Sequence, residues 1–149
     1  MKHSLHALSV IQPWAHIIVF KGKNVENRTV NYRMRGFFAI HASAKYDAYN
    51  FSFLKNYRLK LSRDELDFGA IIGFAELVDV ITRKQVKRNT QRWFTGKYGL
   101  VLKNIIPLKL AVPAKGSLGF WPLKGAALNK CLSQLSQRKQ KMILDHPLS

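Results

Sequence analysis

The spacing of apolar residues changes along the first third of the chain, and each change marks a predicted element. Residues 7–11 and 36–42 are short, nearly continuous apolar runs, which are typical of buried strands. Between them, apolar residues recur at helical spacing after Pro13, which fits the first turn of a helix because its missing N–H is not needed there. Gly22 follows and can end this helix in a left-handed conformation. Residues 25–29 predict a short extended segment.

Strands dominate the pattern further along the chain. Residues 68–80 form a long apolar stretch interrupted by two glycines, which indicates a strand with bulges or sharp bends. Residues 98–102 and 105–112 predict two strands or one bent strand, and residues 119–123 predict a short closing strand. Ahead of this region, aromatic residues four apart within residues 47–59 predict a helix with an aromatic face.

The last part of the chain predicts a helix. From Gly125 onward, apolar residues recur at helical spacing, and basic residues occupy the positions between them. A polar, basic stretch at residues 83–94 is expected to be a short helix or a loop. Taken together, the pattern predicts an α+β fold: a small mixed barrel of about five to six strands with flanking helices and a C-terminal helix. We expect one domain at residues 1–124 and a basic helical extension at residues 125–149 that packs on it.

The charge of the chain points to a polyanionic partner. Lysine and arginine number 25 against 8 aspartates and glutamates, which gives a net charge of +17. The excess is uneven, because no acidic residue occurs between Asp79 and Asp145. A potential of this size attracts polyanions, and nucleic acid is the usual partner of so basic a domain. The alternative is a generic basic surface that only keeps the protein soluble.

Several other classes of protein do not fit the sequence. No apolar run approaches the ~20 residues of a membrane-spanning helix, and no lipidation motif is present. The first residues lack the apolar core of a signal peptide. Cys131 is the only cysteine, so an internal disulfide or a thiolate metal site cannot form. We therefore expect a cytoplasmic protein that needs no cofactor and does not bind a membrane.

The segment after Gly22 carries the most informative group of charges. Lys23, Glu26 and Arg28 are close in sequence: Glu26 is expected to share a face with Lys23, and the alternation of a strand places Arg28 on the face of Glu26. Lys23 can bind phosphate as a compact cation, or act as a base if burial removes its proton. Glu26 between two cations predicts a paired network. The alternative is that this network only ties the first helix to the sheet.

With its neighbours, this motif resembles the ASCH domain, the activating-signal-cointegrator homology module of the PUA-like superfamily, whose signature is G-x-K-x-x-E-x-R. Four segments carry the resemblance in order: residues 8–15 (LSVIQPWA), 23–28 (KNVENR), 35–45 (RGFFAIHASAK) and 69–79 (GAIIGFAELVD). It implies a PUA-like β-barrel with a cleft for RNA or DNA beside the first helix. Lys21 holds the place of the signature glycine and Gly22 follows it, which implies a rebuilt turn and an extra positive charge at the mouth of the cleft.

Lys23 and Glu26 are the candidate catalytic residues. The candidate nucleic-acid-binding residues are basic or aromatic and lie near the motif or near glycines at strand ends: Trp14, Lys21, Arg28, Arg35, Lys45, Lys97 and Lys115. Trp14 begins the first helix, where free N–H groups favour an anion. Lys45 resembles a recurrent lysine that lines the cleft in the family. His41 lies in an apolar strand and is expected to be a hydrogen-bonded core histidine.

Three functions remain open at this point. The favoured one is an RNA-binding or DNA-binding module with a basic cleft and one pocket for an unstacked base. The second is a hydrolase. As a ribonuclease, Lys23 would stabilise the charged phosphorane while Glu26 takes the 2′-hydroxyl proton. Some family members resemble amidohydrolases of N4-acetylcytidine, but Glu26 replaces their threonine and no glutamate follows Glu76 as the distant partner. The third, a pure protein-interaction module, fits the charge least well.

Overall fold

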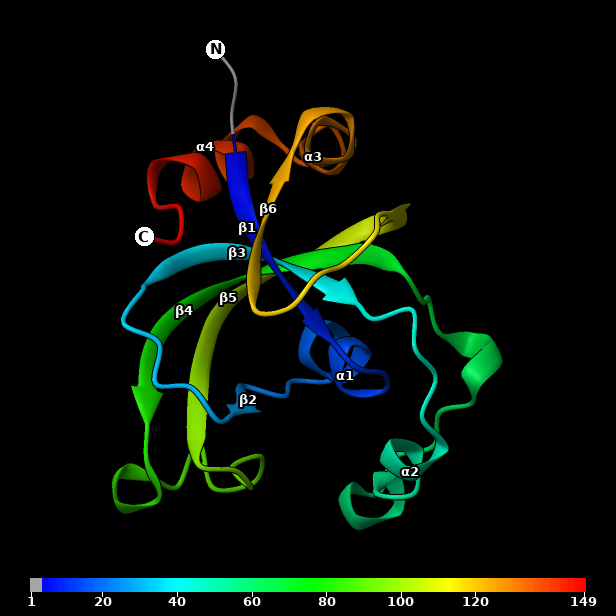
Figure 1. The fold of residues 1–149 in the computed structure, drawn as a ribbon, viewed down its shortest axis with the longest axis vertical. Helices are drawn as coiled ribbons and strands as arrows, with labels where there is room; N and C mark the ends of the chain where they lie inside the picture. Colours follow the sequence, from blue (N-terminus) through cyan, green and yellow to red (C-terminus); the bar gives the residue numbers. More distant parts are fainter. Residues whose placement is uncertain (1–3) are drawn as a thin grey trace.

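A computed structural model describes residues 4–149 of the chain (Figure 1). Its strands are β1 (Ser4–Val10), β2 (Val25–Arg28), β3 (Gly36–Ala42), β4 (Ala70–Ile81), β5 (Tyr98–Pro113) and β6 (Phe120–Lys124). Its α-helices are α1 (Trp14–Phe20), α2 (Ala48–Phe51), α3 (Gly125–Leu132) and α4 (Gln137–Asp145). Its short 3-10 helices are η1 (Leu54–Tyr57), η2 (Arg63–Glu65) and η3 (Arg83–Gln85). The predicted α+β class is confirmed.

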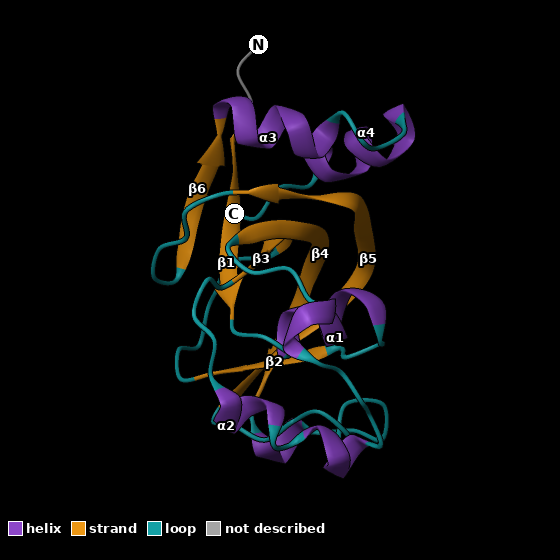
Figure 2. Cartoon of the chain, turned by 90° about the vertical axis from the view of Figure 1, so that its right-hand side faces the viewer, coloured by secondary structure: helices purple, strands orange, loops and turns teal. Residues whose placement is uncertain are grey.

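All the strands join one mixed sheet in the order β2-β5-β4-β3-β1-β6. β1 runs parallel to β3, and every other neighbouring pair is antiparallel. The sheet is strongly curled, as Figure 2 shows. One correction to the expected barrel follows from the strand order. The edge strands β2 and β6 do not pair with each other in the part of the chain that the structure describes, so the sheet stays open.

Helix α1 explains why the curled sheet needs no closing strand pair. The helix packs against β3, β4 and β5. Ile18 and Val19 on its inner face share a core cluster with Leu8 of β1 and Leu100 of β5. The apolar surface that a closed barrel would enclose is therefore buried under a helix instead. Gly22 ends this segment in a left-handed conformation with φ of +80°, as the sequence predicts, and returns the chain towards β2.

The helix expected at residues 47–59 is interrupted. α2 covers one turn and η1 another, with a break at Ser52. The hydroxyl of Ser52 donates a 2.6 Å hydrogen bond to the carbonyl of Tyr49, and such a side-chain bond competes with the regular helical ladder. The aromatic residues differ in exposure: Phe53 and Tyr57 line a pocket, whereas Tyr49 is 68% exposed and meets Phe53 edge to face with ring centroids 4.9 Å apart.

Strands β4 and β5 form the long hairpin of the sheet. Of the two alternatives expected for residues 98–112, the structure has the single bent strand, β5, in which Asn104 has a positive φ of 51°. The pairing of β4 with β5 shifts register near Gly73, as expected of a bulge. A side chain at Gly73 would approach the carbonyl oxygen of Ile106 to 2.9 Å, so only glycine fits there without a shift of the backbone.

The C-terminal segment contains two helices, α3 and α4, where the sequence predicted one. The hydroxyl of Ser136 caps α4 by accepting a hydrogen bond from the amide of Lys139. Leu128 and Ile143 are fully buried in the same core cluster as Phe37 of β3. Residues 146–149 then pair with the start of β3 through backbone hydrogen bonds. Within residues 4–149, no helix has the length and apolar character that crossing a bilayer requires.

Candidate functional site

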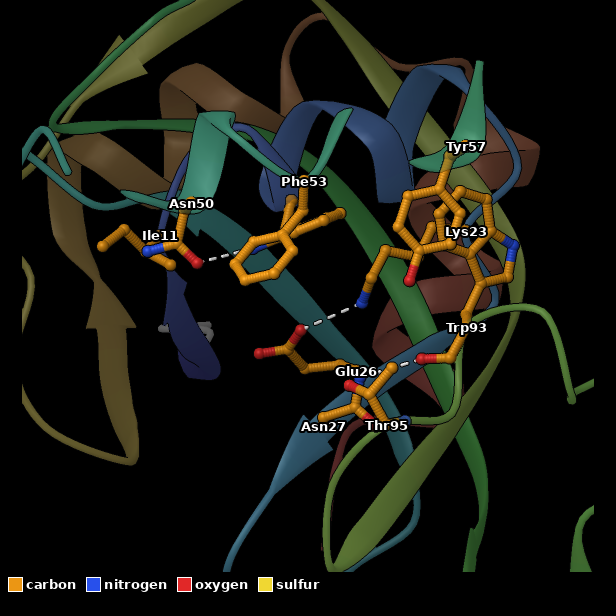
Figure 3. Close-up of a pocket in the computed structure, with 10 residues that line it drawn as sticks. Ile11, Lys23, Glu26, Asn27, Asn50, Phe53, Tyr57, Trp93 and Thr95 are labelled. Carbon is orange, nitrogen blue, oxygen red and sulfur yellow. Dashed lines mark hydrogen bonds and ion pairs between the residues drawn. The ribbon is translucent and has the colours of Figure 1, made fainter. Parts of the chain in front are cut away.

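A pocket of about 390 Å³ lies where four parts of the chain meet: the end of β1 with α1, strand β2, the α2–η1 segment, and the loop between β4 and β5 (Figure 3). The residues that line it are Ile11, Trp14, Lys23, Glu26, Asn27, Asn50, Phe53, Tyr57, Trp93 and Thr95. Four of the ten lining residues are aromatic, and the charged groups come from the Lys23–Arg28 motif. A pocket of this size, mostly apolar with a few polar groups that converge, is typical of a ligand site.

Lys23 is buried in this wall, with 4% of its surface exposed. Its ammonium donates hydrogen bonds to the carbonyl of Val25 and to Oε1 of Glu26, the latter at 3.3 Å. It also lies 5.8 Å from the centre of the Trp14 ring. Burial lowers the pKa of Lys23 below its usual range, and the neighbouring Glu26 carboxylate only partly opposes that effect. The charged form of this lysine is therefore less favoured here than in water.

Glu26 is the centre of the predicted charge network, and the network is confirmed. Its Oε2 accepts a hydrogen bond from Nε of Arg28 at 3.0 Å, and a terminal nitrogen of Arg28 forms an ion pair with the same oxygen at 2.9 Å. Arg28 also donates to the carbonyl of Ser9 at 2.8 Å, which ties β2 to β1. An ammonium has three donors and Lys23 uses two of them, so one remains for a ligand. Oε1 of Glu26 accepts from Lys23 alone and retains acceptor capacity.

Aromatic side chains build the other walls. The rings of Tyr57 and Trp93 stack with centroids 4.5 Å apart, and Trp14 meets Tyr57 edge to face at 5.9 Å. The indole N–H of Trp14 donates to Oδ1 of Asn50 at 2.8 Å, which fixes the α2 segment to α1. Because these rings hold one another in place, the pocket is formed before any ligand enters it.

Asn27 attaches the β4–β5 loop to the motif strand. Its amide nitrogen donates to the carbonyl of Trp93 at 2.9 Å, and its oxygen accepts from the amides of Thr95 and Gly96 at 2.8 and 3.0 Å. A side chain at Gly96 would come within 3.0 Å of Asn27 Cβ, so this close approach favours glycine. The loop that carries Trp93 is thereby held against the charge network.

The pocket suits a flat ligand that is neutral or anionic. Glu26 is the only carboxylate among the lining residues, and Lys23 and Arg28 both pair with it, so cations exceed anions around it. A cationic ligand is disfavoured by this excess, although the aromatic wall alone would accept one. In residues 4–149 no group of three or more metal-ligating side chains comes together.

The structure brings some of the sequence-predicted residues together and separates others. Lys23, Glu26 and Trp14 line the pocket, and Arg28 lies directly behind Glu26. The remaining predicted binding residues do not line it: Lys21, Arg35, Lys45, Lys97 and Lys115. Arg35 instead donates to the carbonyls of neighbouring residues and lies 3.8 Å from a carboxylate oxygen of Asp79.

Several lining residues were not identified from the sequence as site residues: Ile11, Asn27, Asn50, Phe53, Tyr57, Trp93 and Thr95. The aromatic spacing in residues 47–59 is a signal for Phe53 and Tyr57, although it predicts a helix face and not a pocket wall. Trp93 has no local signal, because its place depends on how the β4–β5 loop folds back onto β2.

His41 is a hydrogen-bonded core histidine, as expected. Its Nε2 lies 2.7 Å from the carbonyl of Ala114, which accepts the ring proton, and its Nδ1 lies 2.9 Å from Oγ of Ser9. Trp121 donates to the same Ser9 oxygen at 3.1 Å. Burial lowers the pKa of His41 below its ordinary 6.5. This group ties the β5–β6 connection to β1 and β3.

The fold and site define a small α+β domain whose pocket combines aromatic walls with an ion-paired, buried lysine. No protein-family model matches the sequence. The human protein activating signal cointegrator 1 is 30% identical to it over 126 residues, which cover 78% of this chain and 22% of the human protein. The chain thus spans about a fifth of the length of this curated relative. This similarity agrees with the motif resemblance and supports an ASCH-like domain in this chain.

Proposed function

We propose that this domain binds single-stranded nucleic acid, RNA in preference to DNA, and takes one unstacked base into the pocket. The observation that carries the proposal is the aromatic-walled pocket with a lysine donor and a glutamate acceptor side by side. The net charge of +17 supports it, because phosphate contacts supply most of the affinity in such complexes. RNA is favoured because unstacked bases occur mainly in its loops, bulges and single strands.

Base chemistry fits the free groups of the pocket. Every base has a flat face, and stacking on an aromatic side chain contributes about 1–3 kcal/mol. Every base also presents a hydrogen-bond acceptor beside a donor on its Watson–Crick edge. Lys23 can donate to that acceptor while Oε1 of Glu26 accepts from the donor, since the two protein atoms lie 3.3 Å apart.

Glu26→Gln tests this proposal because general electrostatics and pocket binding predict opposite results. The substitution removes a negative charge, so binding by charge alone should strengthen. In the pocket, the glutamine oxygen stays with Arg28, and an NH₂ group then replaces the acceptor that faces the base. We therefore expect weaker binding of a labelled single-stranded RNA, measured by fluorescence anisotropy at low and moderate salt.

Glu76→Gln is the matched control. Glu76 loses the same charge, lies outside the pocket, and keeps an amide oxygen that can accept from Asn104 as the carboxylate does at 2.8 Å. Its RNA affinity should stay equal to wild type or rise slightly. If Glu26→Gln binds as tightly as Glu76→Gln, no base occupies the pocket. If the wild-type protein binds no single strand even at low salt, nucleic-acid binding itself is wrong.

Hydrolysis is the second candidate function, and one observation favours it. Burial lowers the pKa of Lys23, so its ammonium can release a proton more readily, and the Glu26 carboxylate beside it can accept one, inside a ligand-sized pocket. Cleavage of RNA would need only these two groups, whereas amide hydrolysis would lack a second carboxylate in the pocket. A denaturing gel of the titrated RNA distinguishes the candidates. RNA that is shortened by the wild-type protein but stays intact with Lys23→Ala would show an enzyme.

A further inference from the structure

The loop between β4 and β5 is the most strongly charged exposed segment beside the pocket. Residues 82–97 contain no acidic side chain. Its basic side chains are all exposed: Arg83, Lys84, Lys87, Arg88, Arg92 and Lys97. Trp93 and Thr95 of the same loop line the pocket. The positive charge therefore begins at the rim of the pocket and continues away from it along one segment.

This loop is held in a fixed conformation despite its charge. Thr90, Trp93 and Phe94 are buried, with exposed fractions of 5%, 5% and 8%. The amide of Lys87 donates to the hydroxyl of Thr90 at 3.0 Å. The side chain of Asn24, next to the motif lysine, donates to a carbonyl of the loop at 2.8 Å. Cations on a frame of this kind lose little conformational entropy when they bind an anion.

Arg92 is the best-positioned of these cations. Its guanidinium carbon lies 4.8 Å from the centre of the Trp93 ring and 5.5 Å from that of Tyr57, the stacked pair of the pocket wall. One of its nitrogens donates to the carbonyl of Tyr57 at 3.0 Å. Its side chain is nevertheless exposed. A guanidinium stacked at the outer side of a base pocket is suited to a phosphate oxygen, which it can contact with its remaining N–H groups.

We propose that Arg92 binds the phosphodiester next to the base held in the pocket, and that the β4–β5 loop guides the adjoining backbone. This inference rests on the proposed function. A second hollow, of about 480 Å³, shares the loop and includes Lys87, Asn89 and Lys103 in its lining. Asp79 also lines this hollow, so its two lysines exceed its one carboxylate and offer the backbone a weakly basic surface beside the same loop. The ligand is a single-stranded phosphodiester chain. Comparing the affinities of an RNA and a DNA oligonucleotide of the same sequence shows which sugar the protein prefers.

The test compares Arg92→Ala with Arg138→Ala in salt titrations of a labelled single-stranded RNA. Both variants lose one positive charge, and Arg138 is an exposed residue of α4, far along the chain from the loop. A lost phosphate contact lowers the slope of log affinity against log salt by about 0.7 for a single strand. We expect that reduction, with several-fold weaker binding at low salt, for Arg92→Ala and not for Arg138→Ala.

Arg92→Lys separates a positioned guanidinium from a mere charge, since lysine keeps the charge but loses the planar stack. We expect it to restore the affinity only in part, and full recovery would overturn the positioned contact. If Arg92→Ala and Arg138→Ala show the same affinity and the same salt slope while Glu26→Gln still binds more weakly, the proposed contact between the loop and the backbone would be wrong. The proposal that a base binds in the pocket would then still stand. Failure of the wild type to bind would instead remove the proposed function on which the path depends.

Discussion

Lys23→Met tests whether the buried charge network serves to hold the fold together or to bind a ligand. Methionine has a similar length and an unbranched apolar chain, so it can fill the same space. It removes the ammonium and both hydrogen bonds that the ammonium donates to the Val25 carbonyl and the Glu26 carboxylate. Glu26 keeps its two contacts with Arg28 and is not left as an unpaired buried charge.

The expected change in the free energy of unfolding is small because two large contributions oppose each other. Hydrogen bonds of a charged group contribute about 1.5–3 kcal/mol each, so two of them amount to roughly 3–6 kcal/mol. Removing an ammonium from water costs several kcal/mol even in a relaxed protein site. The lowered pKa of Lys23 shows that desolvation outweighs its attraction to Glu26. We therefore expect Lys23→Met to change the stability by no more than about 1 kcal/mol.

The assay is urea unfolding at neutral pH, with Lys21→Met as the control for an exposed lysine two residues away. The slope of the unfolding free energy against urea concentration should match that of wild type. A matching slope means that the variants differ in stability and not in the surface exposed on unfolding. A structural network predicts instead a loss of about 3–5 kcal/mol, as for other broken buried pairs. A loss of that size for Lys23→Met, with Lys21→Met unaffected, would refute the reasoning.

The pH dependence of the same pair of proteins gives an independent check. The folded-state pKa of Lys23 lies below its ordinary value of 10.5, so between the two values the unfolded chain binds more protons. Stability then rises with pH in that window. Wild type should therefore gain stability relative to Lys23→Met as the pH approaches about 10. A constant difference between the two proteins would show that Lys23 is not perturbed.

Two further predictions concern the group that joins β1, β3 and the β5–β6 connection. A side chain at Gly116 would lie 2.5 Å from Oγ of Ser9 and 2.7 Å from Cε1 of His41. Gly116→Ala should therefore destabilise the protein by about 1–3 kcal/mol, measured by thermal unfolding. An unchanged unfolding midpoint would contradict this packing. Because burial lowers the pKa of His41 below 6.5, the unfolded chain binds the extra proton first, and wild type should lose stability relative to His41→Gln as the pH falls below that value. Urea midpoints of both proteins at about pH 7.5 and pH 5 measure this, and parallel changes would argue against a titrating His41.

Local patterns were enough to predict most of the strands, the first helix and the charge network. The apolar run at residues 36–42 corresponds to β3, and the alternation within β2 places Glu26 and Arg28 on one face, while Lys23 reaches Glu26 from the residues before the strand. Both features depend on neighbours in the sequence: a buried strand needs a continuous apolar run, and side chains in an extended segment alternate.

The remainder of the site depends on contacts between distant segments. The pocket wall needs the stack of Tyr57 on Trp93, and neither residue's surroundings reveal the other. The helix expected at residues 47–59 is broken by the hydrogen bond of Ser52, which competes with the helical pattern on a local scale. The barrel was expected because many short strands suggest closure, but the burial of α1 against the sheet removed the need for it.

The strand order also sets when the site can exist during synthesis. β2 carries the motif, and its only strand partner is β5, in a register that joins Val25 to Val101 and Arg28 to Tyr98. Lys23 and Glu26 are therefore synthesised early, but their strand can pair only after the residues near position 100 have been synthesised. Trp93, which closes the pocket wall, comes only shortly before. A growing chain therefore lacks this pocket until most of the domain has emerged, and any ligand of the pocket can bind only after that point.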